Sequence, residues 1–166
     1  MSGSPSTEAT ALRVALAALA AGDLDAWQPL PDAATADDLT AAAPTGEPPI
    51  AHRLLLGQPA TSVLLPASAG APFGVVVWLQ HDRVTLVETR EPALSADPMT
   101  TLGAPELTLR SGLAALGDQI CWPSIGLTLH RQADGRVLVL YAYPPTTTDV
   151  MRASPLAQVS ATRTPR

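Results

Sequence analysis

The sequence predicts an α+β protein: two tandem helix-plus-antiparallel-hairpin repeats form one mainly antiparallel sheet covered by helices, with an extra N-terminal helix. Three observations predict it. Apolar residues near the start have helical spacing, β-type patterns run from residue 50 to about 143, and two stretches of the chain resemble each other. A chain of 166 residues is long enough for one domain, or for two small halves that share a core.

The first predicted element is a helix that ends at Gly22. Ser4 and Pro5 are its expected cap and first-turn proline. Its apolar face follows i, i+3, i+4, i+7 spacing: Leu12, Ala15, Leu16 and Leu19. Residues 29–49 are rich in Pro, Ala and Thr and predict a loop region, within which Thr35 is expected to cap a short helix that reaches residue 42.

An internal repeat organises the β-rich part of the chain. FGVVVWLQHDRVTLVETREP, residues 73–92, aligns with IGLTLHRQADGRVLVLYAYPP, residues 125–145, with one gap opposite Gly135. Six of the twenty paired positions are identical, and upstream LGQP at 56–59 matches LGAP at 102–105. We therefore predict one compact domain with a helix and loop region at 1–49, a first repeat at 50–92 whose helix begins at 36, a second at 93–150, and a flexible basic tail at 151–166.

Each repeat predicts the same order of elements. A short helix ends at the Leu-Gly of LGxP, where glycine can take the left-handed conformation. A strand follows at 61–65 or 106–109, then an irregular connection at 66–72 or 111–119, and then a hairpin. The expected turns are residues 80–83 and Asp134-Gly135. VLVLYAY has no polar face, so the second hairpin is expected to be covered on both sides.

This helix, LGxP and strand meander, whose later pair contains Asp-Gly-x-Val, resembles the repeated unit of the beta-lactamase inhibitor proteins and the SmpA/OmlA small lipoproteins. The resemblance covers residues 37–92 and 97–145. The inhibitor family has two such units in tandem and binds enzymes through the concave face of its sheet. The resemblance implies the same architecture and a protein-binding sheet here.

Composition excludes several function classes. The net charge is −5 and no basic cluster is present, which argues against nucleic-acid binding. No segment approaches the ~20 apolar residues of a membrane-spanning helix. One cysteine excludes an intramolecular disulfide, so we expect a cytoplasmic protein. Ten Arg without Lys, together with abundant Ala and Pro, are typical of a high-GC bacterial genome.

Catalytic residues, cofactors and metal ligands are not predicted. Cys121 and His130 are nine residues apart, but no third group orients them, and His130 aligns with Trp78, which favours a strand position over a catalytic base. His52 and His81 are as scattered as His130 and form no metal-binding motif. The acidic pairs are expected to face water: Asp37 with Asp38, and Glu88 with Glu91.

The aromatic residues give the candidate partner or ligand surface: Trp78, His130, Trp122, Tyr141 and Tyr143. The simpler interpretation is that these rings fill a core with few aromatics.

We predict a non-catalytic binding protein that presents its sheet to a protein partner, as inhibitor, immunity or assembly factors do. Alanine at Trp78 and His130 should then weaken binding without unfolding the domain. The alternative is a small-molecule-binding protein or small enzyme with a pocket between sheet and helix, lined by Trp27, Trp122 and Tyr141.

Overall fold

The computed structural model describes residues 3–44, 48–110 and 117–157, with the side chain of His52 left out. Its helical elements are α1 (Thr7–Ala21), η1 (Leu24–Ala26), α2 (Ala36–Ala42), α3 (Pro98–Leu102), η2 (Pro123–Ile125) and α4 (Thr148–Ala153). Its strands are β1 (Ile50–Leu55), β2 (Gln58–Leu65), β3 (Val75–Gln80), β4 (Arg83–Arg90), β5 (Leu107–Leu109), β6 (Asp118–Trp122), β7 (Leu127–Arg131) and β8 (Val137–Ala142). None of the helices within these ranges is both long and apolar enough to cross a membrane.

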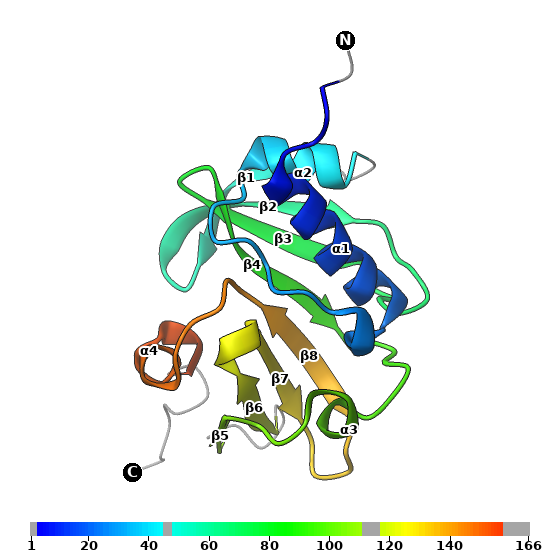
Figure 1. The fold of residues 1–166 in the computed structure, drawn as a ribbon. Helices are drawn as coiled ribbons and strands as arrows, with labels where there is room; N and C mark the ends of the chain where they lie inside the picture. Colours follow the sequence, from blue (N-terminus) through cyan, green and yellow to red (C-terminus); the bar gives the residue numbers. More distant parts are fainter. Residues whose placement is uncertain (1–2, 45–47, 111–116, 158–166) are drawn as a thin grey trace.

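The strands form one antiparallel sheet in the order β1-β2-β3-β4-β8-β7-β6-β5. This order consists of two four-stranded meanders joined where β4 pairs with β8 (Figure 1). The predicted α+β class with a mainly antiparallel sheet is confirmed.

The helix face of the sheet carries the main core. α1 buries the four predicted apolar residues and ends at Gly22, whose φ of 67° places it in the left-handed region. Its cap is Ser6 rather than Ser4, because the Ser6 hydroxyl accepts a hydrogen bond from the Ala9 amide. Thr35 caps α2 as expected and forms a reciprocal capping box with Asp38. The sheet residues of this core come from both meanders: Val63, Leu65, Val75, Val77, Leu79, Val84, Val87, Ile120, Trp122, Leu127, Leu129, Leu140 and Ala142.

A smaller core lies on the second face of the sheet and is covered by α4, beside the second meander (Figure 1). Met151 of α4 and Ala157 are each 2% exposed, and the Leu156 carbonyl accepts a hydrogen bond from Gln119 Nε2. The predicted flexible tail is therefore wrong for residues 151–157, since apolar residues spaced along this segment pack on the sheet. Residues 158–166 lie outside the described part.

The first LGxP segment does not end a helix. Leu56 and Gly57 form the two-residue turn between β1 and β2, with Leu55 and Gln58 as the pair that closes it. The second LGxP ends a helix as predicted: α3 ends at Leu102, and the amide of Gly103 donates to the Met99 carbonyl. Gly103 has φ 80° and ψ −166°, so it is not in the expected left-handed helical conformation. The LGxP pattern gives two structures because a glycine with positive φ occurs both in hairpin turns and at helix ends.

The two predicted hairpins are confirmed, with turns at His81-Asp82 and around Gly135. Each has a register shift at the equivalent place, after Trp78 in β3 and after His130 in β7. Residues 127–130 of β7 are buried on both faces, but residues 137–139 and Tyr141 of β8 are only half-buried, so the expected cover on both sides holds for one strand of the second hairpin and not for the other. β6 begins at Asp118, so the irregular connection expected at 111–119 is wrong at its end, and 111–116 lie outside the described residues. That the two halves are repeats of one another stays a prediction.

Candidate partner surface

Four of the five predicted surface residues lie on the second face of the sheet. Trp78 and His130 are 8% and 3% exposed, Tyr143 is buried, and Tyr141 is half-buried. Trp122 points to the opposite, helix face, where it is buried and its indole donates to the Gly103 carbonyl over 3.3 Å. Period-two alternation separates Cys121 from Trp122 in this way, so the sheet brings four of the five residues to one face.

The predicted pocket between Trp27, Trp122 and Tyr141 is not formed. Trp27 packs on the helix-face core, and its indole donates to the Ile125 carbonyl over 2.9 Å. Tyr141 packs on the second face instead. The sheet itself separates Tyr141 from the two tryptophans, so these rings cannot line one cavity.

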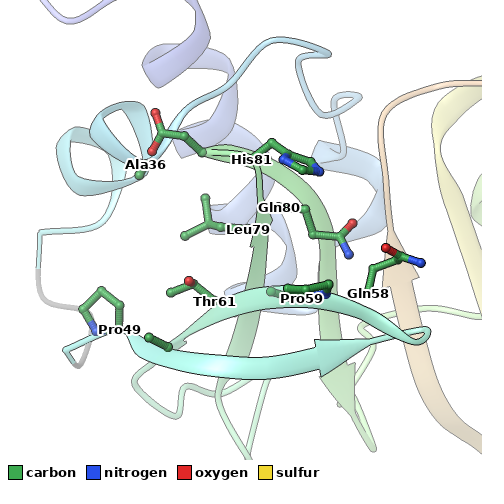
Figure 2. Close-up of a pocket in the computed structure, with 11 residues that line it drawn as sticks. Ala36, Pro49, Gln58, Pro59, Thr61, Leu79, Gln80 and His81 are labelled. Atoms are coloured by element: carbon green, nitrogen blue, oxygen red, sulfur yellow. The ribbon is translucent and has the colours of Figure 1, made fainter.

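A cavity of about 830 Å³ lies elsewhere, between the β1–β2 hairpin, the start of α2 and the β3–β4 turn (Figure 2). Pro59 and Thr61 line it from β2, Leu79 from β3 and Ala36 from α2, and His81 lies at the turn. It is an open hollow whose walls are mostly small or apolar. The sequence pattern gave no signal for it because residues distant in the chain make the walls.

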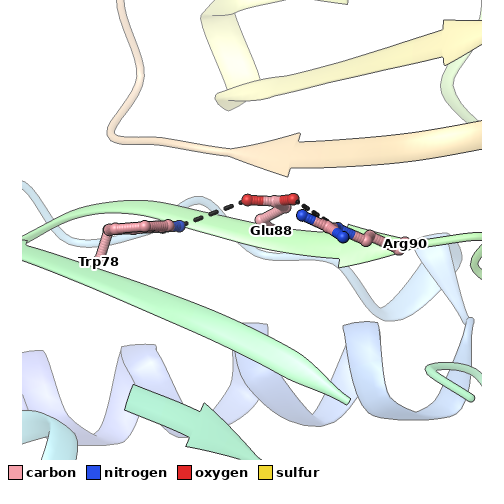
Figure 3. A network of polar contacts seen from close by, with 3 residues as sticks. All are labelled: Trp78, Glu88 and Arg90. Carbon is pink, nitrogen blue, oxygen red and sulfur yellow. Dashed lines mark hydrogen bonds and ion pairs between the residues drawn. The ribbon is translucent and has the colours of Figure 1, made fainter. Parts of the chain in front are cut away.

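Glu88 lies between Trp78 and Arg90 on the second face (Figure 3). Its carboxylate accepts from Trp78 Nε1 over 3.4 Å and from Arg90 Nε over 3.2 Å. The Glu88 side chain is only 13% exposed, whereas that of Arg90 is 73% exposed. The guanidinium of Arg53 lies 5.4 Å from the centre of the Trp78 ring. The expectation that Glu88 faces water is therefore wrong, and the two contacts fix its carboxylate in one position.

His130 contacts Tyr141 edge-on, with ring centres 5.6 Å apart. Burial lowers the pKa of His130, so the imidazole is held neutral, and its Nδ1 has no hydrogen-bond partner among the described residues. Burial, with a smaller contribution from Glu88, raises the pKa of Tyr141 to about 12. The hydroxyl of Tyr143 lies 2.8 Å from Thr128 Oγ1 and donates to the Leu127 carbonyl. These rings are packed and uncharged at neutral pH.

Cys121 lies on the same face but is not arranged as a nucleophile. It is fully buried beside Thr128, its cross-strand partner in β7. Burial raises the pKa of the Cys121 thiol, which keeps it protonated. A nucleophilic cysteine needs a thiolate and an adjacent base, and the environment here favours neither. No group of three or more metal-ligating side chains gathers within the part of the chain that the structure describes.

Part of the second face is only half covered. One cross-strand row runs Leu64–Val76–Glu88–Tyr141, and Val139 adjoins it in β8. We call these five residues the open strip. All five are half-buried, whereas their neighbours on the helix face, such as Val75, Val87 and Leu140, are buried. Among these five residues only Tyr141 was a predicted surface residue, because a strand with apolar residues on both faces does not indicate which face is covered.

A second exposed feature is the end of the β1–β2 hairpin. In this segment Leu54 is 68% and Leu56 41% exposed, and Arg53 is exposed beside them. We call residues 53–59 the hairpin tip. The sequence pattern does not reveal this tip, because Leu-Gly is equally typical of a helix end.

No protein-family model, curated protein or solved structure matches this chain. The resemblance to the beta-lactamase inhibitor proteins and SmpA/OmlA lipoproteins therefore stays a prediction, and the chemistry of the surface alone has to support a function.

Proposed function

We propose that this chain is a non-catalytic binding protein that presents the second face of its sheet to a protein partner, as inhibitor, immunity or assembly factors do. The observation that supports it best is the open strip. It combines aliphatic side chains and one tyrosine with a carboxylate held by Trp78 and Arg90. Aromatic side chains are enriched at interface centres and carboxylates are depleted there, so Tyr141 and the aliphatic residues support a contact surface, whereas Glu88 would need an oppositely charged or hydrogen-bonding group of the partner. A cytoplasmic location belongs to this proposal, because the only cysteine is a free thiol.

Buried residues cannot carry this contact directly. Trp78 and His130 are too deeply buried to contact a partner. We therefore expect Tyr141 and Glu88, which lie beside them, to make the contact. Each carboxylate oxygen of Glu88 already accepts one hydrogen bond, from Trp78 and from Arg90, and can accept another, so Glu88 would meet a basic or hydrogen-bond-donating group of the partner.

The test compares the wild type with Y141A, Y141F and T40A immobilised against a clarified extract of the source cells, followed by mass spectrometry. We expect a specific protein whose capture falls at least tenfold with Y141A. Y141F keeps the ring and T40A changes an exposed site on α2, so both should retain capture. Urea unfolding of each variant must show that it is folded. Equal capture by Y141A and the wild type would contradict the proposal.

A second candidate function, small-molecule binding, is supported by the cavity between the β1–β2 hairpin and α2, which is large enough for a drug-sized ligand. Its probe is 8-anilinonaphthalene-1-sulfonate, an anionic fluorophore whose aromatic rings bind apolar surfaces. If the cavity binds small apolar molecules, the dye should bind with one-to-one stoichiometry, and T61W, which fills the cavity from β2, should abolish that binding. Dye binding that does not saturate, or that is unchanged in T61W, would contradict small-molecule binding in this cavity.

A further inference from the structure

Exposed apolar side chains are concentrated in β1 and its turn. Five large hydrophobic residues are exposed in the part of the chain that the structure describes, and three of them lie within seven positions: Ile50, Leu54 and Leu56. The other two, Phe73 and Val150, are isolated. Single exposed apolar residues are ordinary on a protein surface. Leu54 and Leu56 lie together at the turn end of the hairpin, whereas Ile50 lies at the other end of β1, so Leu54 and Leu56 form the candidate contact site.

Leu56 is the most informative of the three because its backbone is strained. It has a φ of 52° and is followed by Gly57 at 81°, so both central residues of the turn are left-handed. Turns of this type strongly prefer Asn, Asp or Gly at the first position, and a bulky residue there is an outlier. The other two-residue turn uses His81 and Asp82, which tolerate that region better. Leu56 is 41% exposed, so its side chain is only partly covered, and its contacts offset only part of the strain.

The hairpin tip itself carries one formal charge, Arg53, whose guanidinium lies over the Trp78 ring, while Asp82 of the β3–β4 turn lines the same hollow as Gln58 and Pro59. Residues 48–81 contain no Asp or Glu, and their only formal charge is Arg53, whereas the whole chain has a net charge of −5. An isologous pairing of two tips would bring Arg53 close to its own copy, which like charges disfavour. A partner with acidic groups beside an apolar groove suits the tip better.

We propose that the hairpin tip inserts Leu54 and Leu56 into an apolar groove of the protein partner whose rim carries acidic side chains that meet Arg53. This rests on the proposed function and adds to it the element that enters the partner and the chemistry of the site it enters. The strain at Leu56 is retained because the exposed leucine is needed for contact.

The first test needs no partner. L56N places the preferred residue in the turn, and V150N makes the same polar change at an exposed site on α4. We expect L56N to melt about 2 °C higher than the wild type, because it relieves the left-handed strain. V150N should melt as the wild type does. A lower melting temperature for L56N would show that Leu56 serves the fold and would overturn the proposal.

The second test captures proteins from a clarified extract of the source cells with the wild type, L56N, R53E, R53K, V150N and Y141A, each measured by light scattering beforehand. We expect capture of one protein to fall at least tenfold with L56N and R53E and to persist with R53K and V150N. If only Y141A loses capture, the sheet-face function stands and the tip inference fails. If no variant loses it, or the wild type captures nothing specific, both fail. A wild-type dimer that becomes monomeric in L56N would mean that a second copy occupies the tip, which also overturns the proposal.

Discussion

Trp78 joins the core of the second face to the open strip. Its ring is buried against Leu86 and Ala60, its indole nitrogen holds Glu88, and Arg53 covers one side. Removing it would leave a cavity and release the carboxylate at once. Trp78 therefore positions the surface residues that a partner would contact, although its own side chain is too buried for direct contact.

We therefore expect W78A to lower the free energy of unfolding by about 3 kcal/mol, in place of the neutral effect that the sequence suggested. W78F, which keeps most of the ring volume but not the hydrogen bond to Glu88, should cost about 1 kcal/mol. Urea unfolding followed by far-UV circular dichroism measures both. A W78A variant as stable as the wild type would show that the second face is not packed as described.

His130 should make stability depend on pH. Because burial lowers its pKa in the folded state, the unfolded chain takes up this proton first as the pH falls below about 6.5. Stability is thus fully present above that pH and declines below it, by at most about 1.4 kcal/mol per pH unit for this group. Urea unfolding between pH 7.5 and 5.5 should show the decline in the wild type and in H81Q, whose target is exposed. H130F should flatten it, and an unchanged slope in H130F would refute the assignment.

At the scale of elements, Gly126 and Gly135 provide a matched pair around β7. Both have positive φ, 68° and 89°, but a Cβ on Gly126 would lie 1.9 Å from the Tyr143 carbonyl oxygen. A Cβ on Gly135 would meet nothing closer than 3.5 Å, at an Arg131 side chain. Both alanine variants lose about 1 kcal/mol to the left-handed backbone, and G126A should lose at least about 2 kcal/mol more. If urea unfolding shows that G126A and G135A lose the same free energy of unfolding, the backbones at Gly126 and Tyr143 do not approach as closely as described.

α4 covers the part of the second face that lies next to the open strip. M151D would place an unpaired carboxylate against Cys121 and Tyr143 and should lower the free energy of unfolding by at least about 2 kcal/mol. It should also make Cys121 react with a thiol reagent at least tenfold faster than in the wild type, where the thiol is fully buried. M151L keeps the apolar contact and serves as the control. If M151D is folded and Cys121 stays unreactive, α4 is not the element that shields the thiol.

At the scale of the whole molecule, the two meanders share one core and one sheet. β4 and β8 pair over four positions, and the helix-face core contains Val87 from the first meander and Leu140 from the second. Neither meander can lose its partner without exposing apolar surface and a sheet edge. Unfolding by urea should therefore be a single transition, with coincident midpoints by tryptophan fluorescence and far-UV circular dichroism. Separate midpoints would show that the halves unfold independently.

Local signals predicted much of this architecture. The first helix, the Thr35 cap, both hairpins and the end of α3 follow from caps, turns and periodicity that act within a few residues. Local signals failed at Leu56-Gly57 and at residues 151–157. In the first case the Leu-Gly dipeptide occurs both in a hairpin turn and at a helix end. In the second, a short segment rich in small and apolar residues has no distinct periodicity, and only the sheet beneath it shows which of them are buried.

The sequence by itself determined the class of fold, the turns of the β3–β4 and β7–β8 hairpins and the absence of a recognisable catalytic motif, because these depend on spacing and on backbone preferences. Tertiary structure alone decided that Trp122 and Tyr141 lie on opposite faces, that α4 covers Cys121, and that the open strip and hairpin tip stay exposed. A strand that is apolar on both faces carries no information about which face another element will cover, since that is settled only when the whole chain has packed.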